Sequence, residues 1–168
     1  MIINEKTVDA MNAQIQSEFL ASAQYAAMAI YFDEKGLPDL AQYFYRQSDE
    51  ERGHAMKFVH FMLDAGAKPL IPAVPEVRNE FESPEDVVET SLKQELKVTD
   101  QINNLMHIAV EERDFTSQQF LQWFVDEQVE EVESFTLLLQ TIQHSAGNLL
   151  LVEDFVRRHA QPQGPSAA

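Results

Sequence analysis

The sequence of 168 residues contains no cysteine, and this absence excludes disulfide bonds, thiolate metal sites and thiol nucleophiles. Glycine and proline are scarce, at five and seven residues, which indicates long uninterrupted helices. No hydrophobic run approaches the roughly 20 residues of a membrane span. The N-terminus also lacks the layout of a secretory signal. We therefore expect a soluble, cytoplasmic protein with no membrane partner.

Basic residues are also few, 12 against 28 acidic residues, so the formal net charge is −16. A chain this acidic does not carry the clustered Lys and Arg of a general nucleic-acid-binding protein, and we expect no nucleic-acid partner. Most acidic chains owe their negative charge to solubility alone. A more specific interpretation of the charge is that it attracts cations to a cavity or channel. Hydrophobic residues make up 45% of the chain, enough for one globular domain with a sizeable core.

Apolar residues recur at helical spacing over four long segments. We expect helices over residues 5–34, 38–64, from Ser83 onward, and 114–145, each about 45 Å long. Ser83 is a good N-cap residue, and the proline that follows it suits a first helical turn. Gly36, Gly66 and Gly147 stand where three of these helices end.

The lengths of the connections predict the topology. The first and third connections have only a few residues, so each joins antiparallel neighbours. Residues 66–82 contain three prolines and, at about 3.3 Å per residue, are long enough to cross the whole bundle. We predict an all-α protein: an antiparallel four-helix bundle with one long crossover over residues 1–147. A short C-terminal fifth helix over 148–159 and a flexible tail over 160–168 follow.

Four glutamates lie inside the apolar stripes of the four long helices: Glu18, Glu51, Glu95 and Glu131. Burying one ionised carboxylate costs several kcal/mol, whereas a whole domain is stable by only about 5–15 kcal/mol. A single such glutamate is usually a stripe-edge residue that reaches solvent, but four at matching levels are poorly explained by chance. A salt-bridge network would need inward basic residues, and the nearby ones fall on outer faces: Arg46, Arg52, Lys57, Lys93 and Lys97.

One histidine joins these carboxylates. His54 follows Glu51 by one helical turn, a spacing that lets both side chains bind one metal ion. An oxygen-rich set with one nitrogen suits iron or manganese and disfavours structural zinc. Gln128 lies on the same broad face as Glu131, and Glu127 lies at its edge.

Four sequence motifs resemble those of bacterial haem-free ferritins, most closely the large actinobacterial ones. They are Asn12-Ala-Gln-Ile-Gln-Ser-Glu18, Ser48-Asp-Glu-Glu-Arg-Gly-His54, Gln94-Glu95 and Phe120-Leu-Gln-Trp-Phe-Val-Asp-Glu-Gln-Val-Glu-Glu131. The resemblance covers nearly the whole chain and implies that the predicted bundle is a ferritin-like antiparallel four-helix bundle. It implies a ferroxidase that oxidises Fe(II) and stores it as ferric mineral inside a homo-oligomeric shell of 24 subunits.

The resemblance also implies roles for individual residues. Glu18, Glu51 and His54 hold a first iron, and Glu51 bridges to a second iron held by Glu95 and Glu131. Gln128 and Tyr25 adjoin this dinuclear centre. Four glutamates match a third, exit-side iron site: Glu50, Glu127, Glu130 and Glu131.

Departures from related families narrow the expectation. Bacterioferritins carry a second Glu-x-x-His and a haem-ligating Met next to the bridging glutamate, whereas this chain has Gln128-x-x-Glu131 and Arg52, so we expect no haem. DNA-coating mini-ferritins place their irons between subunits and lack such a set within the bundle. The other histidines fall off the inner faces and are expected at the surface or at interfaces: His60, His107, His144 and His159.

Iron storage and detoxification is therefore the predicted function. Two Fe(II) per chain are oxidised by O2 or H2O2, and the carboxylates stabilise the ferric product. An apolar strip of Leu20, Ala27 and Tyr31, together with residues 149–156, fits either subunit interfaces or packing on the same bundle. Two alternatives stay open: a dinuclear-iron oxygenase or peroxidase, and a metal-free structural or cargo bundle.

Overall fold

The computed structural model describes residues 1–159, and all of its regular secondary structure over that range is helical. The five helices are α1 (Glu5–Glu34), α2 (Pro38–Asp64), α3 (Pro84–Glu111), α4 (Phe115–His144) and α5 (Leu149–His159). This confirms the predicted four-helix bundle with a short fifth helix. The predicted tail, residues 160–168, lies outside the described residues.

Side chains just outside the helices determine where three of them begin. The side-chain oxygens of Asn4, Ser83 and Asp114 each accept a hydrogen bond from a backbone N–H in the first turn of the following helix. The third and fourth helices therefore begin one residue after the predicted Ser83 and Asp114, because a capping residue stays outside the helix. Gly36 and Gly147 follow helix ends with φ of +69° and +85°, a conformation that strains residues with a side chain.

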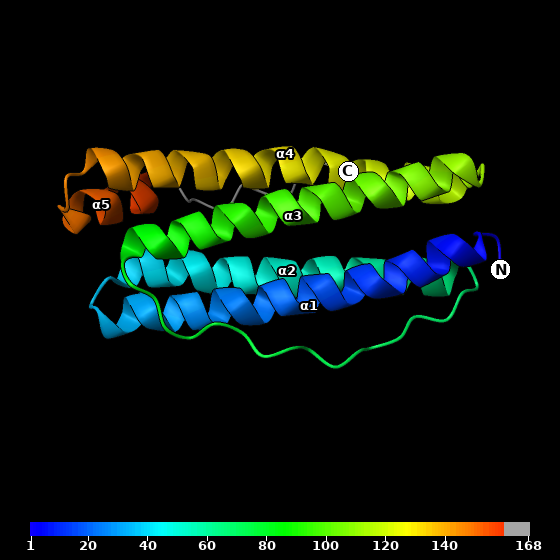
Figure 1. The fold of residues 1–168 in the computed structure, drawn as a ribbon, viewed down its shortest axis with the longest axis horizontal. Coiled ribbons are helices and arrows are strands. Elements are labelled where there is room, and N and C mark those ends of the chain that lie inside the picture. The colour runs from blue at the N-terminus through cyan, green and yellow to red at the C-terminus, as the bar shows by residue number, and fades with distance from the viewer. Residues whose placement is uncertain (160–168) are drawn as a thin grey trace.

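The four long helices form two antiparallel pairs, α1 with α2 and α3 with α4 (Figure 1). The crossover between α2 and α3 runs the length of the bundle beside α1, so α2 and α3 point the same way (Figure 1). Helix α5 packs against α2 and α4 at one end of the bundle. None of the described helices has both the length and the apolar character needed to cross a membrane.

Amide side chains on one side of α1 hold the crossover. Asn12 Oδ1 accepts from the backbone N–H of Leu70 at 2.8 Å, and Gln16 Nε2 donates to a backbone carbonyl three residues further on. Gln24 makes two bonds to the backbone of Arg78: its Nε2 donates to the carbonyl at 2.7 Å, and its Oε1 accepts from the N–H at 2.9 Å. The crossover therefore has a fixed course although it contains no helix or strand.

The crossover also packs against the outer apolar strip of α1. Ala27 and Tyr31 are buried, and the Tyr31 ring packs edge-on against Phe81 of the crossover at 5.6 Å. Within one chain, this part of the strip is therefore packed on its own bundle, and Leu20 is half-buried. On α5, Val152 is buried in the core. Two leucines on its other side stay exposed: Leu150 and Leu151.

The hydrophobic core has two clusters, one toward each end of the bundle. One contains Tyr25, Phe44 and Phe135 together with residues of α5, and the other contains Phe58 and Phe124. The chain passes from one cluster to the other near the middle of each long helix. The residues at these four crossing points are the predicted inward glutamates, so the acidic groups lie between two apolar masses.

Candidate metal centre

The four inward glutamates are almost completely buried, with exposed fractions of 0, 1, 1 and 5% for Glu18, Glu51, Glu95 and Glu131. They come from α1, α2, α3 and α4 in that order. Helical spacing requires this placement, because each glutamate lies three or four residues from a core residue on the same face. The predicted inward orientation is therefore what the fold shows.

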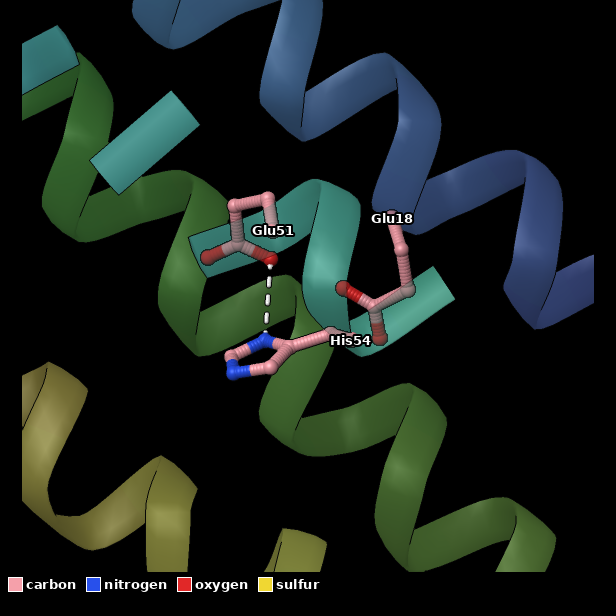
Figure 2. Close-up of side chains that lie close together, drawn as sticks. All are labelled: Glu18, Glu51 and His54. Atoms are coloured by element: carbon pink, nitrogen blue, oxygen red, sulfur yellow. Dashed lines mark hydrogen bonds and ion pairs between the residues drawn. The ribbon is translucent and has the colours of Figure 1, made fainter. Parts of the chain in front are cut away.

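Glu18, Glu51 and His54 lie together, with one ligand atom from each residue within 4.8 Å of the others (Figure 2). His54 Nδ1 is 3.3 Å from Glu51 Oε2. One further oxygen on each glutamate, Glu18 Oε2 and Glu51 Oε1, is buried and has no hydrogen-bond partner. Buried acceptors without a partner are rare in folded proteins, and a bound cation is a partner that carboxylate oxygens readily take.

Glu95 lies on the opposite pair of helices and is held by two side chains. The Tyr25 hydroxyl donates to Glu95 Oε1, and Gln128 Nε2 donates to Glu95 Oε2 at 3.2 Å and to the Glu95 carbonyl at 3.1 Å. Glu131 Oε2 accepts from Gln47 Nε2 at 3.2 Å. Neither Glu95 nor Glu131 belongs to the group of ligand atoms within 4.8 Å formed by Glu18, Glu51 and His54.

Burial and crowding oppose ionisation of these groups. Burial is the largest cause that raises the pKa of Glu18, Glu51 and Glu131 well above the ordinary value, and the negative charge of a neighbouring glutamate is the next. The pKa of Glu95 is also raised by burial, although hydrogen bonds from Tyr25 and Gln128 act in the opposite direction. A bound cation would reverse this effect, because its positive charge favours the ionised carboxylates.

No lysine or arginine supplies that positive charge among the described residues. None of the ion pairs formed by Lys or Arg involves any of the four glutamates. Of the basic residues predicted on outer faces, Arg46 is half-buried and the other four are exposed: Arg52, Lys57, Lys93 and Lys97. With carboxylate oxygens and one imidazole, the donor set fits hard or borderline divalent metals such as Fe(II).

The predicted third-site residues differ in burial and in their contact with His54. Glu127 is half-buried, and its Oε1 lies 3.8 Å from His54 Nε2. Glu50 and Glu130 are exposed, and neither makes an ion pair among the described residues. The negative charges of Glu50 and Glu127 nevertheless contribute to the raised pKa of Glu131, so these acids are neighbours of the centre.

Sequence reasoning missed two buried glutamines. Gln14 Nε2 donates to Glu18 Oε1 at 2.9 Å, and Gln47 Nε2 donates to Glu131. Both lie one helical turn before an inward glutamate, Glu18 or Glu51, so the spacing could have revealed them. The other four histidines, by contrast, are exposed as predicted: His60, His107, His144 and His159.

Comparison with known proteins shows a likeness over most of the chain. Residues 8–145 match the model of the ferritin-like domain. The chain is 45% identical over 160 residues to ferritin BfrB of Mycolicibacterium smegmatis, a match that covers 92% of this chain and 88% of the relative. It is 36% identical over 134 residues to a bacterial non-heme ferritin of Staphylococcus aureus, covering 80% and 81%.

Solved structures give the same result for the fold. An open-pore ferritin from the hyperthermophilic archaeon Archaeoglobus fulgidus superposes with a TM-score of 0.89 at 35% sequence identity. The superposition covers 92% of this chain and 96% of that one. The likeness therefore extends over the whole bundle.

Proposed function

The chain belongs to the ferritin family, and from that premise we propose how its bundle handles iron. The function is iron storage, and the reaction is oxidation of Fe(II) to Fe(III). We assign the reaction to a dinuclear centre between the two helix pairs, which takes two Fe(II) per chain as substrate. The first iron is held by Glu18, Glu51 and His54. The second is held by Glu95 and Glu131, with Glu51 bridging and with Gln128 and Tyr25 beside the centre.

The observation that carries this proposal is the pair of buried carboxylate oxygens without partners, Glu18 Oε2 and Glu51 Oε1. They lie next to His54 in a group that no Lys or Arg neutralises among the described residues. Such a group is costly unless a cation occupies it, since desolvated charges of one sign destabilise the fold. Four acidic groups also favour Fe(III) over Fe(II), because the higher charge gains more from the same carboxylates.

The electrons and protons balance with either oxidant. Two Fe(II) lose two electrons; these reduce O2 to H2O2 with two protons, or reduce H2O2 to two water molecules with two protons. Iron binding displaces protons from carboxyl groups whose pKa is raised, so the centre releases protons as it fills. The side chains of Phe44, Phe58 and Phe124 are buried in the two apolar clusters on either side of the centre. We take this aromatic packing to favour iron over an organic substrate.

The ferric product must then leave the centre and be stored. We propose that Glu127, Glu130 and Glu50 accept iron with Glu131 at a third site and pass it outward, because these acids extend from the buried centre to the exposed surface. Ferritin relatives form multi-subunit cages, and this chain is a subunit of such a homo-oligomer. We propose a shell of 24 subunits, a particle of about 460 kDa.

The proposal also covers the division of the chain, the absence of haem and the location of the protein. We assign residues 1–147 to the bundle that contains the centre and residues 148–159 to the segment that carries α5 (Leu149–His159). The protein works without haem, since Arg52 stands at the position next to the bridging glutamate where bacterioferritins carry the haem-ligating Met. We place it in the cytoplasm.

The test is anaerobic titration of Fe(II), followed by air, with sedimentation of the same sample. We expect two rapidly oxidised irons per chain and a particle of about 460 kDa. Glu51→Ala removes the bridging carboxylate and should abolish rapid oxidation while the helices and the particle persist. Glu133→Ala, an exposed acid on α4, is the matched control and should oxidise iron at the parent rate. Parent-rate oxidation by Glu51→Ala would refute the assignment.

A further inference from the structure

Three buried glutamines each donate a hydrogen bond to a different inward glutamate. Gln128 holds Glu95, as described above, whereas Gln14 and Gln47 have no role in the proposed ligand set. Both are almost fully buried, with exposed fractions of 3 and 6%. A buried amide costs free energy unless its groups are bonded, so these two positions need a physical reason.

Gln14 fixes one oxygen of Glu18. The two residues are one turn apart on α1, and Gln14 Nε2 donates to Glu18 Oε1 at 2.9 Å. The other oxygen, Glu18 Oε2, stays buried without a partner. The bond therefore occupies one side of the carboxylate and leaves the other for a cation next to Glu51 and His54.

Gln47 acts in the same way across the helix pairs. It lies on α2, one turn before Glu51, and donates to Glu131 Oε2 on α4 at 3.2 Å. The same Nε2 lies 3.4 Å from the hydroxyl oxygen of Tyr43, one turn earlier on α2. The amide nitrogen is thus held by its own helix while it restrains a carboxylate from another helix, and the amide oxygen, Gln47 Oε1, is buried without a partner.

A neutral donor suits this task better than a charged one. Lys or Arg would also restrain the carboxylates, but its positive charge would cancel the attraction that draws a cation into the centre. An amide N–H fixes the direction of a carboxylate and leaves its negative charge for the metal. Residues that orient metal ligands in this way commonly contribute about 10–100-fold to metal affinity.

We propose that Gln14 and Gln47 are positioning residues that serve different irons: Gln14 orients Glu18 for the first iron, and Gln47 orients Glu131 for the second. This inference rests on the dinuclear centre proposed above. It predicts that the two amides act selectively, each on its own metal position. A general packing role would affect both positions alike.

The test uses Co(II), which reports binding without oxidation. Gln14→Met and Gln47→Met remove the donor and keep a long unbranched side chain; Gln14→Asn and Gln47→Asn keep the amide but are one methylene too short to reach. Gln24→Met is the matched control, because Gln24 is a similarly buried amide that bonds the crossover. Sedimentation first verifies assembly. Anaerobic Co(II) titration then gives affinities, and anomalous diffraction at the cobalt edge gives the occupancy of each position.

For the parent protein we expect two Co(II) per chain. Gln14→Met and Gln14→Asn should weaken the position at Glu18 about 10–100-fold, and the Gln47 variants should weaken the position at Glu131 by a similar factor. Gln24→Met should leave both positions at parent affinity. Parent affinity at both positions in the Gln14 or Gln47 variants, or equal weakening of both positions, would overturn the inference. Failure of the parent itself to bind Co(II) would instead overturn the proposed centre.

Discussion

Glu153 of α5 caps the start of α2: its Oε2 accepts from the backbone N–H of Asp39 at 2.7 Å and from that of Leu40 at 3.2 Å. The residue before α2, Leu37, has no side chain that could provide this cap. The fifth helix therefore supplies a carboxylate that another helix lacks, and Arg157 of α5 adds an ion pair to the Asp39 side chain at 3.2 Å. Capping across elements ties α5 to the bundle.

Loss of this cap should destabilise the docking of α5. We expect Glu153→Ala to lower the free energy of unfolding by about 1 kcal/mol, the usual cost of removing a helix N-cap. Glu153→Gln keeps an acceptor oxygen at the same distance and should lose less. Thermal unfolding of both variants measures the difference. Equal stability of Glu153→Ala and the parent would mean that water replaces the carboxylate without cost.

The metal-free protein should lose stability as the pH rises. Burial raises the pKa of Glu18, Glu51 and Glu131, so the folded state binds protons more tightly than the unfolded state. Their contribution to stability is fully present below the unfolded pKa of about 4.3 and is lost as the pH rises through the raised folded values.

This dependence can be isolated with one substitution. Glu18→Gln removes one titrating group, so the metal-free variant should gain stability relative to the parent as the pH increases from about 5 to about 8. Unfolding of chelator-treated protein across this range measures the gap, and Glu133→Gln on the exposed side of α4 is the control. A gap that stays constant with pH would contradict the raised pKa of Glu18.

Tyr25→Phe should affect the metal-free protein more than the loaded one. The Tyr25 hydroxyl donates to Glu95 inside the bundle, and removing a partner from a buried charged acceptor costs about 1–3 kcal/mol. A bound metal gives Glu95 another partner and reduces that cost. Unfolding midpoints with and without Co(II) compare the two states. An equal loss in both states would show that Tyr25 contributes through packing of its ring alone.

Gln24→Met should weaken the crossover and leave the metal centre intact. It removes both hydrogen bonds between the Gln24 amide and the Arg78 backbone, which should lower the free energy of unfolding by about 1–3 kcal/mol. Hydrogen exchange at the Arg78 amide should become faster, while rapid Fe(II) oxidation stays at the parent rate. Unchanged exchange would mean that Arg78 is held through its ion pair with Asp86 instead.

The sequence by itself determined the helices and the burial of the acids. The cap at Ser83 and the breaks at Gly36 and Gly147 mark helix ends through local backbone chemistry, so they can be read without a fold. The inward orientation of the glutamates follows from helical periodicity in the same way. The long connection after α2 was sufficient to predict the crossover.

Only the tertiary structure decided which side chains meet. It showed that Gln47 of α2 holds Glu131 of α4, that Glu153 of α5 caps α2, and that the crossover covers Tyr31. These contacts join residues 50 to more than 100 positions apart, and they depend on the offset and rotation of packed helices. Periodicity specifies the face on which a residue lies, whereas the distance between two faces is set by how the whole core packs.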